Sequence, residues 1–88
     1  MYLIYVLYSK KHNKIYIGQT VDLIKRFEEH NSSGLSSNSY TKRYIPWEVI
    51  YKEEYNTRPE SLRREKQLKS QKGREFIWNL IKGKMVSN

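Results

Sequence analysis

The first twenty residues contain two apolar runs separated by a short polar break. Residues 2–9, YLIYVLYS, form a continuous run of aliphatic and aromatic side chains that is apolar on both faces, which is typical of a central strand. Residues 14–18, KIYIG, form the second run, and the break around Asn13 favours a turn. Two strands joined by so short a loop predict an antiparallel hairpin.

A helical pattern follows the hairpin. Thr20 is a good N-cap residue, so we expect the helix to begin just after it. Leu23, Ile24 and Phe27 have the spacing of a core-facing helical stripe, and the helix is expected to end near Asn31.

The rest of the chain predicts a loop, a strand and two helices. Residues 31–44 are polar and rich in Ser and Gly, which predicts a long loop, and loops of this length often have a function. Residues 47–55, WEVIYKEEY, alternate in part and predict a third strand. Residues 57–60, TRPE, form a capping box and predict a helix to about Ser70, which Gly73 separates from a last helix. The apolar face of that last helix is expected to contain Phe76, Ile77, Leu80 and Ile81.

The predicted order of elements is β-β-α-β-α-α. This order indicates an α+β fold with a three-stranded antiparallel sheet flanked by helices. At 88 residues the chain is one small domain, which we place at residues 1–84, followed by a frayed tail at residues 85–88. A chain of this length buries only about 60% of the surface that its unfolded form exposes. We therefore expect one modest core and no site for a small-molecule cofactor.

Composition excludes several classes of protein. The chain has no cysteine, which excludes disulfides and thiolate zinc sites, and its two histidines are too few for a histidine-rich metal site. No apolar run approaches the roughly 18 residues of a membrane span, and the N-terminus has no signal-type pattern. We expect a cytoplasmic protein with no membrane partner.

The charge is uneven along the chain. Lys and Arg outnumber Asp and Glu by 17 to 9, and residues 57–88 hold nine of the basic and only three of the acidic side chains. A basic half indicates a polyanionic partner such as nucleic acid, although a solvated helical face would look the same. The side chains that we expect to contact nucleic acid are Lys42, Arg43, Arg63, Lys66 and Lys69.

Aromatic side chains accompany two of these basic residues. Tyr40, Tyr44 and Trp47 lie close in sequence to Lys42 and Arg43, where they could stack on bases. They could equally pack the edge of a small sheet, which is the interpretation that we favour for Trp47.

Glu65 has an unusual position for a carboxylate, because its neighbours on the predicted helix are apolar. Leu62, Glu65 and Leu68 lie along one side of the predicted helix, so Glu65 sits within an apolar stripe. Burying a carboxylate is costly unless it is paired. Its partner could be a basic side chain such as Arg26 or a divalent cation.

Five further residues suggest chemistry, although none of them is specific individually. Arg26 and His30 are spaced i and i+4, so they share a helix face, where Arg could bind phosphate and His could move a proton. Tyr5 and Tyr16 become neighbours once the hairpin pairs, although most buried tyrosines are core residues. Gly18 would permit a left-handed turn or the close approach of another segment.

Together these residues resemble the GIY-YIG nuclease family. Leu3-Ile4-Tyr5 corresponds to the first motif of the family, and Tyr16-Ile17-Gly18 is its second motif, intact. Residues 16–30, YIGQTVDLIKRFEEH, are similar to the family's succession of YIG, D-L, R and H. Residues 43–76 resemble the second half of small stand-alone members, which are similar to the nuclease domain of the excision-repair protein UvrC. The resemblance covers nearly the whole chain.

The resemblance implies a metal-dependent endonuclease acting on DNA in repair or processing, with one active site on one face of the sheet. Tyr5 and Tyr16 match the motif tyrosines beside the scissile phosphate, and Arg26 matches the catalytic arginine. Glu65 matches the single carboxylate that holds Mg²⁺ or Mn²⁺, and His30 matches a histidine of many members. We expect the metal on Glu65, together with Arg26, to lower the pKa of Tyr5, so that Tyr5 acts as general base and Tyr16 orients the water, although the two roles could be exchanged.

Three departures from the family keep other hypotheses open. Leu3 replaces a glycine, Gln19 stands where some relatives have lysine, and Asn79 is a poor match for a late asparagine. The second hypothesis is a nucleic-acid-binding module of the same fold that cuts weakly or not at all, and the third is a basic scaffold whose partner is a protein. Whether the DNA is nicked or branched, and the oligomeric state, stay open.

Overall fold

The structure, a computed structural model, describes residues 1–31 and 39–86, with the backbone alone described at residues 39 and 84–86. It confirms the predicted α+β fold with a three-stranded antiparallel sheet. The predicted loop is partly wrong, because a short helix occupies residues 39–43; residues 32–38 of that loop lie outside the described part. The elements are β1 (Tyr2–Ser9), β2 (Lys14–Thr20), α1 (Leu23–His30), α2 (Ser39–Arg43), β3 (Glu48–Tyr55), α3 (Arg58–Lys69) and α4 (Gln71–Val86).

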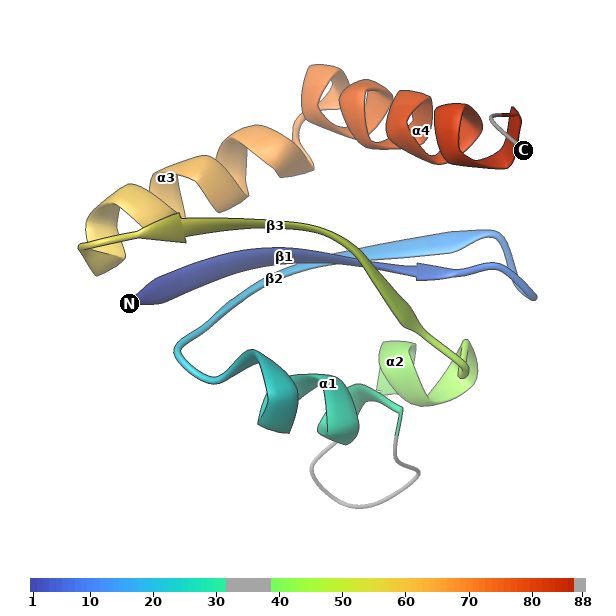
Figure 1. The fold of residues 1–88 in the computed structure, drawn as a ribbon, viewed down its shortest axis with the longest axis horizontal. Coiled ribbons are helices and arrows are strands. Elements are labelled where there is room, and N and C mark those ends of the chain that lie inside the picture. The colour runs from blue at the N-terminus through green and yellow to red at the C-terminus, as the bar shows by residue number, and fades with distance from the viewer. Residues whose placement is uncertain (32–38, 87–88) are drawn as a thin grey trace.

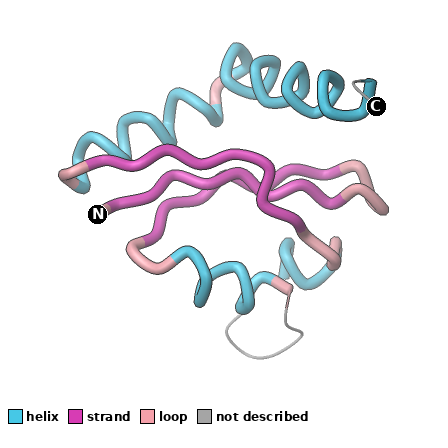
Figure 2. Tube along the Cα trace, in the orientation of Figure 1, coloured by secondary structure: helices cyan, strands magenta, loops and turns pink. Residues whose placement is uncertain are grey.

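β1 is the central strand, as predicted, in the order β2-β1-β3 with both pairings antiparallel. A short turn joins β1 to β2 (Figure 2). β2 continues two residues beyond its predicted end, so Gly18 lies inside the strand, directly opposite Tyr5 of β1. β2 therefore has one edge that no described strand covers, and this edge becomes important for the candidate site.

Helices cover both faces of the sheet, with α3 and α4 on one side and α1 and α2 on the other (Figure 1). This arrangement explains why β1 is apolar on both faces, since alternate residues of a strand point to opposite sides. The core on the α3/α4 side contains Ile4, Val6, Tyr8, Ile17, Leu68, Ile77 and Ile81. The core on the α1/α2 side contains Tyr5, Leu7 and Trp47, so Trp47 packs as predicted.

The start of α1 differs from the prediction. Asp22 is the N-cap, and its side chain accepts a hydrogen bond from the Lys25 backbone N–H at 3.1 Å. Thr20 lies two positions before the cap because β2 extends through it, and its hydroxyl donates instead to the Asp22 carbonyl. Ile24 is 75% exposed, so the predicted stripe is too wide and only Leu23 and Phe27 pack against the core.

α3 begins at the predicted capping box, where the Thr57 side chain accepts a hydrogen bond from the Glu60 N–H. α3 gives way to α4 at Ser70 rather than at Gly73 (Figure 2). Gly73 lies in the first turn of α4, and a Cβ there would meet the backbone of Gln67 and Leu68. The glycine therefore allows the two helices to approach closely, which is a packing role and not a break.

The predicted apolar face of α4 is right in part. Ile77 and Ile81 are buried, whereas Phe76 is 39% exposed and meets Tyr51 edge-on. Trp78, which lies outside the predicted face, packs against the core with its ring perpendicular to that of Tyr8.

α4 extends to Val86, and residues 87 and 88 of the predicted tail lie outside the described part. Within residues 1–31 and 39–86, no helix has the length and hydropathy needed to cross a membrane.

Candidate active site

A buried hydrogen bond joins β1 to the end of α1. The hydroxyl of Tyr5 lies 2.8 Å from Nε2 of His30, and each side chain is only 1% exposed. Burial, above all, and the positive charge of Arg26 lower the pKa of His30 to about 4. The other ring nitrogen, Nδ1, is buried without a hydrogen-bond partner among the described residues, which suits a neutral ring better than a charged one. His30 is therefore a neutral imidazole at neutral pH.

Tyr16 completes a group of three rings. Its centroid lies 4.6 Å from that of His30 and 6.3 Å from that of Tyr5. Tyr16 is half-buried and Tyr5 is fully buried, so only Tyr16 presents part of its side chain to solvent. The hairpin thus brings the two motif tyrosines together, as predicted.

Gly18 makes room for this group. A Cβ at Gly18 would meet the hydroxyl and ring of Tyr5, its cross-strand neighbour. The backbone of Gly18 is not in the left-handed region, so the turn that we considered is wrong. The alternative, close approach of another segment, is correct, because the Tyr5 ring lies over β2 at this position.

Arg26 lies on α1 one turn before His30. Its guanidinium pairs with Glu29 at 3.2 Å, and it is close enough to Tyr5 to affect the hydroxyl. Burial, above all, and Tyr16 raise the pKa of Tyr5 above its ordinary value, and Arg26 only partly opposes them. Arg26 by itself therefore does not lower the pKa of Tyr5, since desolvation outweighs its charge, and the part of the expectation that depends on a metal at Glu65 stays a prediction.

Glu65 reaches the same site from α3, on the other side of the sheet. Its negative charge contributes to the raised pKa of Tyr5, which places the carboxylate within electrostatic range of the Tyr5 hydroxyl. The site therefore draws on both helical layers, and the expectation of a site on one face of the sheet is wrong. α3 contacts β2, the edge strand that carries Tyr16.

Glu65 pairs with a basic side chain, which is one of the two alternatives that we considered, although that side chain is not Arg26. Lys69, one turn further along α3, binds Oε2 of Glu65 at 3.0 Å. Leu62 is 41% exposed and only Leu68 is buried, so the stripe around Glu65 is half solvated. The i,i+4 spacing of Glu65 and Lys69 was the sequence signal for this pair.

An ion pair holds α3 against β3. The Nε atom of Arg64 donates to the carboxylate of Glu53 at 2.9 Å, and the hydroxyls of Tyr51 and Tyr55 donate to the same carboxylate. Arg64 precedes Glu65 directly, so this network fixes the part of α3 that presents Glu65.

The donor set restricts the metal chemistry of this site. Among the described residues, no three side chains of Asp, Glu, His or Cys come together as a ligand group. Mg²⁺ commonly binds through one or two carboxylates and completes its shell with water and substrate phosphate. The single carboxylate of Glu65 fits that pattern and does not fit a site made of protein ligands alone.

A groove adjoins the site at Tyr16. It has a volume of about 460 Å³ and follows the uncovered edge of β2. Three of its side chains are basic and three are aromatic. Its lining consists of residues 13–17 together with Tyr40, Lys69, Arg74 and Trp78.

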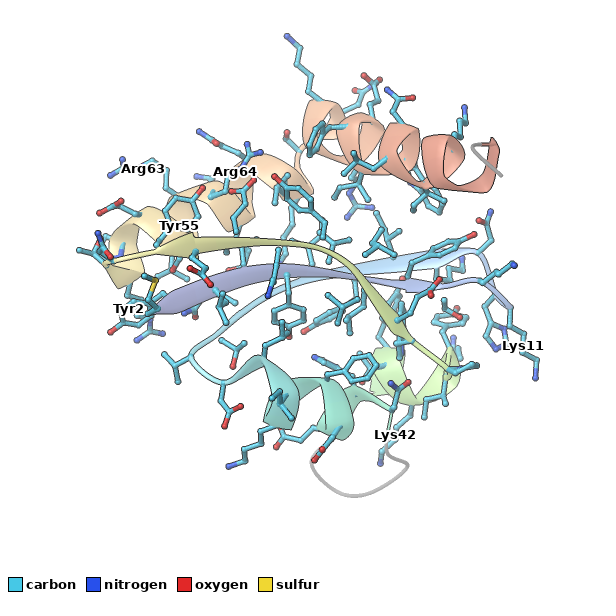
Figure 3. All side chains as sticks on the ribbon, in the orientation of Figure 1. Tyr2, Lys11, Lys42, Tyr55, Arg63 and Arg64 are labelled. Carbon is cyan, nitrogen blue, oxygen red and sulfur yellow. The ribbon has the colours of Figure 1, made fainter. Side chains whose placement is uncertain are left out.

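The groove contains only one of the predicted nucleic-acid contacts, Lys69. Lys42 and Arg63 lie on opposite sides of the sheet (Figure 3), and the other two predicted contacts, Arg43 and Lys66, are exposed on α2 and α3. Lys14 and Arg74 also line the groove and were not predicted, because nothing local in the sequence indicates that β2 and α4 come together there.

Comparison with known proteins identifies the family of the chain. The family model described as the GIY-YIG catalytic domain matches residues 1–79. A UPF0213 protein of Staphylococcus saprophyticus is 33% identical over 60 residues, which cover 68% of this chain and 71% of that protein. No solved structure gives a significant match.

Proposed function

Because this chain belongs to the GIY-YIG catalytic domain family, we propose that it is an endonuclease that hydrolyses DNA phosphodiester bonds with Mg²⁺ or Mn²⁺. The observation that carries the proposal is the meeting of Tyr5, Tyr16, Arg26 and His30 within range of the Glu65 carboxylate. These five side chains come from four elements, and a packing role alone does not require them to converge.

The two tyrosines receive different roles in this proposal. Hydrolysis of a phosphodiester needs a water that loses its proton and attacks in line with the leaving oxygen. Tyr5 is buried and bonded to His30, and its raised pKa keeps it protonated. We therefore assign the base to Tyr16, which is half-buried at the groove, and give Tyr5 and His30 the role of holding the Tyr16 ring.

Arg26 and Glu65 receive the role of stabilising the negative charge of the scissile phosphate, Arg26 directly and Glu65 through a cation. Arg26 offers a planar set of donors that can bind two phosphate oxygens at once. Glu65 would hold the divalent cation, which when bound would neutralise charge on the scissile phosphate and its leaving oxygen. Lys69, which pairs with Oε2 of Glu65, would have to give up that oxygen for Glu65 to hold the cation.

That ion pair also supports a second candidate function. A carboxylate that keeps Lys69 as its partner would not bind a cation, and the protein would bind DNA without cutting it. The same assay separates the two functions.

Cutting of supercoiled, branched and single-stranded DNA, with Mg²⁺, with Mn²⁺ and with chelator, tests the proposal. We expect metal-dependent cutting that Glu65→Gln reduces by about 100-fold or more. Glu54→Gln is the matched control, because Glu54 is exposed on β3, at the opposite edge of the sheet. Tyr16→Phe should reduce kcat as strongly as Glu65→Gln does.

Cutting in chelator, or full activity of Glu65→Gln, would contradict the nuclease mechanism. Binding by the wild type without cutting on any substrate would favour the binding module.

A further inference from the structure

The groove beside β2 is the strongest feature that the proposed site does not use. It begins at Tyr16 and draws its walls from both helical layers, since Tyr40 belongs to α2 and Arg74 and Trp78 belong to α4. Its position next to the proposed base means that a chain lying in the groove would continue directly into the active site.

The charge of the groove suits a phosphate backbone. Lys14, Lys69 and Arg74 contribute positive charge, and no acidic side chain is among the described residues that line it. Arg74 donates through Nε to the Lys69 carbonyl at 3.2 Å, which orients its guanidinium. Its charge also acts on the Tyr40 hydroxyl, so the cation and the ring lie near each other.

Aromatic rings supply surfaces for bases. The Tyr40 centroid lies 6.2 Å from that of Tyr16, 5.0 Å from that of Tyr44 and 6.0 Å from that of Trp47, onto which it stacks. The Tyr40 hydroxyl donates to the Ile15 carbonyl on the β2 edge at 3.0 Å, so the ring is held in place while 40% of the residue stays exposed. The ammonium of Lys14 lies 5.4 Å from the centroid of Tyr44 and extends this alternation of rings and cations.

We propose that this groove binds a single-stranded segment of the DNA substrate and leads it past Tyr16 to the cutting site. Aromatic walls can stack only on bases whose faces are open, whereas the bases of a duplex already stack on one another. The proposal rests on the proposed function, because it specifies the form of that DNA: a flap, an overhang or a branch with an unpaired strand.

Lys69 connects the groove with the carboxylate. Its ammonium now pairs with Glu65, and a cation on Glu65 would release it toward a phosphate in the groove. Cation binding and strand binding would then strengthen each other, because each removes the same ion pair.

Binding of fluorescein-labelled oligo(dT) and of a blunt duplex, in chelator so that no cutting occurs, tests the proposal by anisotropy. We expect Arg74→Gln to weaken oligo(dT) binding about fivefold and to reduce its salt dependence, with little change for the duplex. Tyr40→Leu should weaken oligo(dT) binding about tenfold, and Tyr40→Phe, which keeps the ring, should bind nearly normally. Arg58→Gln is the matched control, since Arg58 is exposed at the far end of α3.

Two outcomes, in variants that circular dichroism shows to be folded, would overturn the proposal: groove variants that behave like Arg58→Gln, or equal losses for oligo(dT) and duplex. Its failure differs from failure of the proposed function. If the protein cuts DNA and the groove variants bind oligo(dT) normally, only the groove proposal is contradicted. If the groove variants selectively lose oligo(dT) binding but the protein never cuts, only the nuclease proposal is contradicted.

Discussion

The two sides of the sheet bury different kinds of side chain. On the α3/α4 side, the core is mostly aliphatic: Ile4, Val6 and Ile17 of the sheet pack on Leu68, Ile77 and Ile81, and Tyr8 joins them. On the α1/α2 side, the buried residues include Tyr5 and His30, which bond to each other, and Trp47, whose indole N–H donates to the Thr41 carbonyl at 2.9 Å.

This difference suggests that the α3/α4 side mainly stabilises the domain, whereas the α1/α2 side positions the polar rings of the candidate site. Apolar burial is strong but has no preferred direction, whereas hydrogen bonds fix the position of a ring. One central strand serves both purposes because its alternate residues face the two layers. The substitutions below change one side at a time.

Leu68→Ala should have the largest effect on stability. Leu68 is fully buried on the α3/α4 side, and removing such a side chain typically costs about 2–5 kcal/mol of unfolding free energy. Urea unfolding measures the loss. Leu62→Ala, on the same helix but 41% exposed, is the control and should cost less than about 1 kcal/mol. Equal losses would mean that the two leucines are packed alike.

The buried histidine on the α1/α2 side should make stability depend on pH. The pKa of His30 is about 4 in the folded state and near 6.5 when unfolded, so the unfolded chain binds more protons between these values. Stability should therefore be complete above about pH 6.5 and should fall, by up to about 3 kcal/mol, as the pH decreases toward 4.

Urea unfolding at pH 4.5 and 7.5 checks this dependence. His30→Gln should reduce the difference between the two pH values, and His12→Gln should keep it, because His12 is not fully buried. An unchanged difference in His30→Gln would assign the pH dependence to the carboxylates.

Gly18→Ala should have a smaller effect on stability and a specific effect on the site. The added Cβ would overlap Tyr5, so the ring must shift away from His30, at a cost of about 1–3 kcal/mol. If the protein cuts DNA, cutting should fall further than stability explains. Gly83→Ala is the control, because nothing lies within 4 Å of its Cβ position in α4 and the change should stabilise that helix by up to about 1 kcal/mol. A Gly18→Ala protein with wild-type stability would show that Tyr5 has room to move.

Some features followed from short stretches of the chain. The central strand, the hairpin and the capping box at Thr57 were predicted because each depends on residues that are neighbours in sequence. The wrong predictions fall where two elements meet. Thr20 belongs to β2 and not to the helix start, and Gly73 lies at the contact between α3 and α4. Trp78, rather than Phe76, packs against the core. Local patterns do not specify which helix packs at which angle.

The sequence by itself determined the fold class, the family motifs and the five residues of the candidate site, since residue type and spacing carry that information. Only the tertiary structure showed that the pKa of Tyr5 is raised and that the missing Cβ of Gly18 leaves room for the Tyr5 ring. Only the tertiary structure showed that Lys14 and Arg74 line a groove with Tyr16. The physical reason is that desolvation, steric contact and electrostatic range depend on distance in space. At the edge of β2, that distance is set by the packing of two helical layers whose residues lie far apart along the chain.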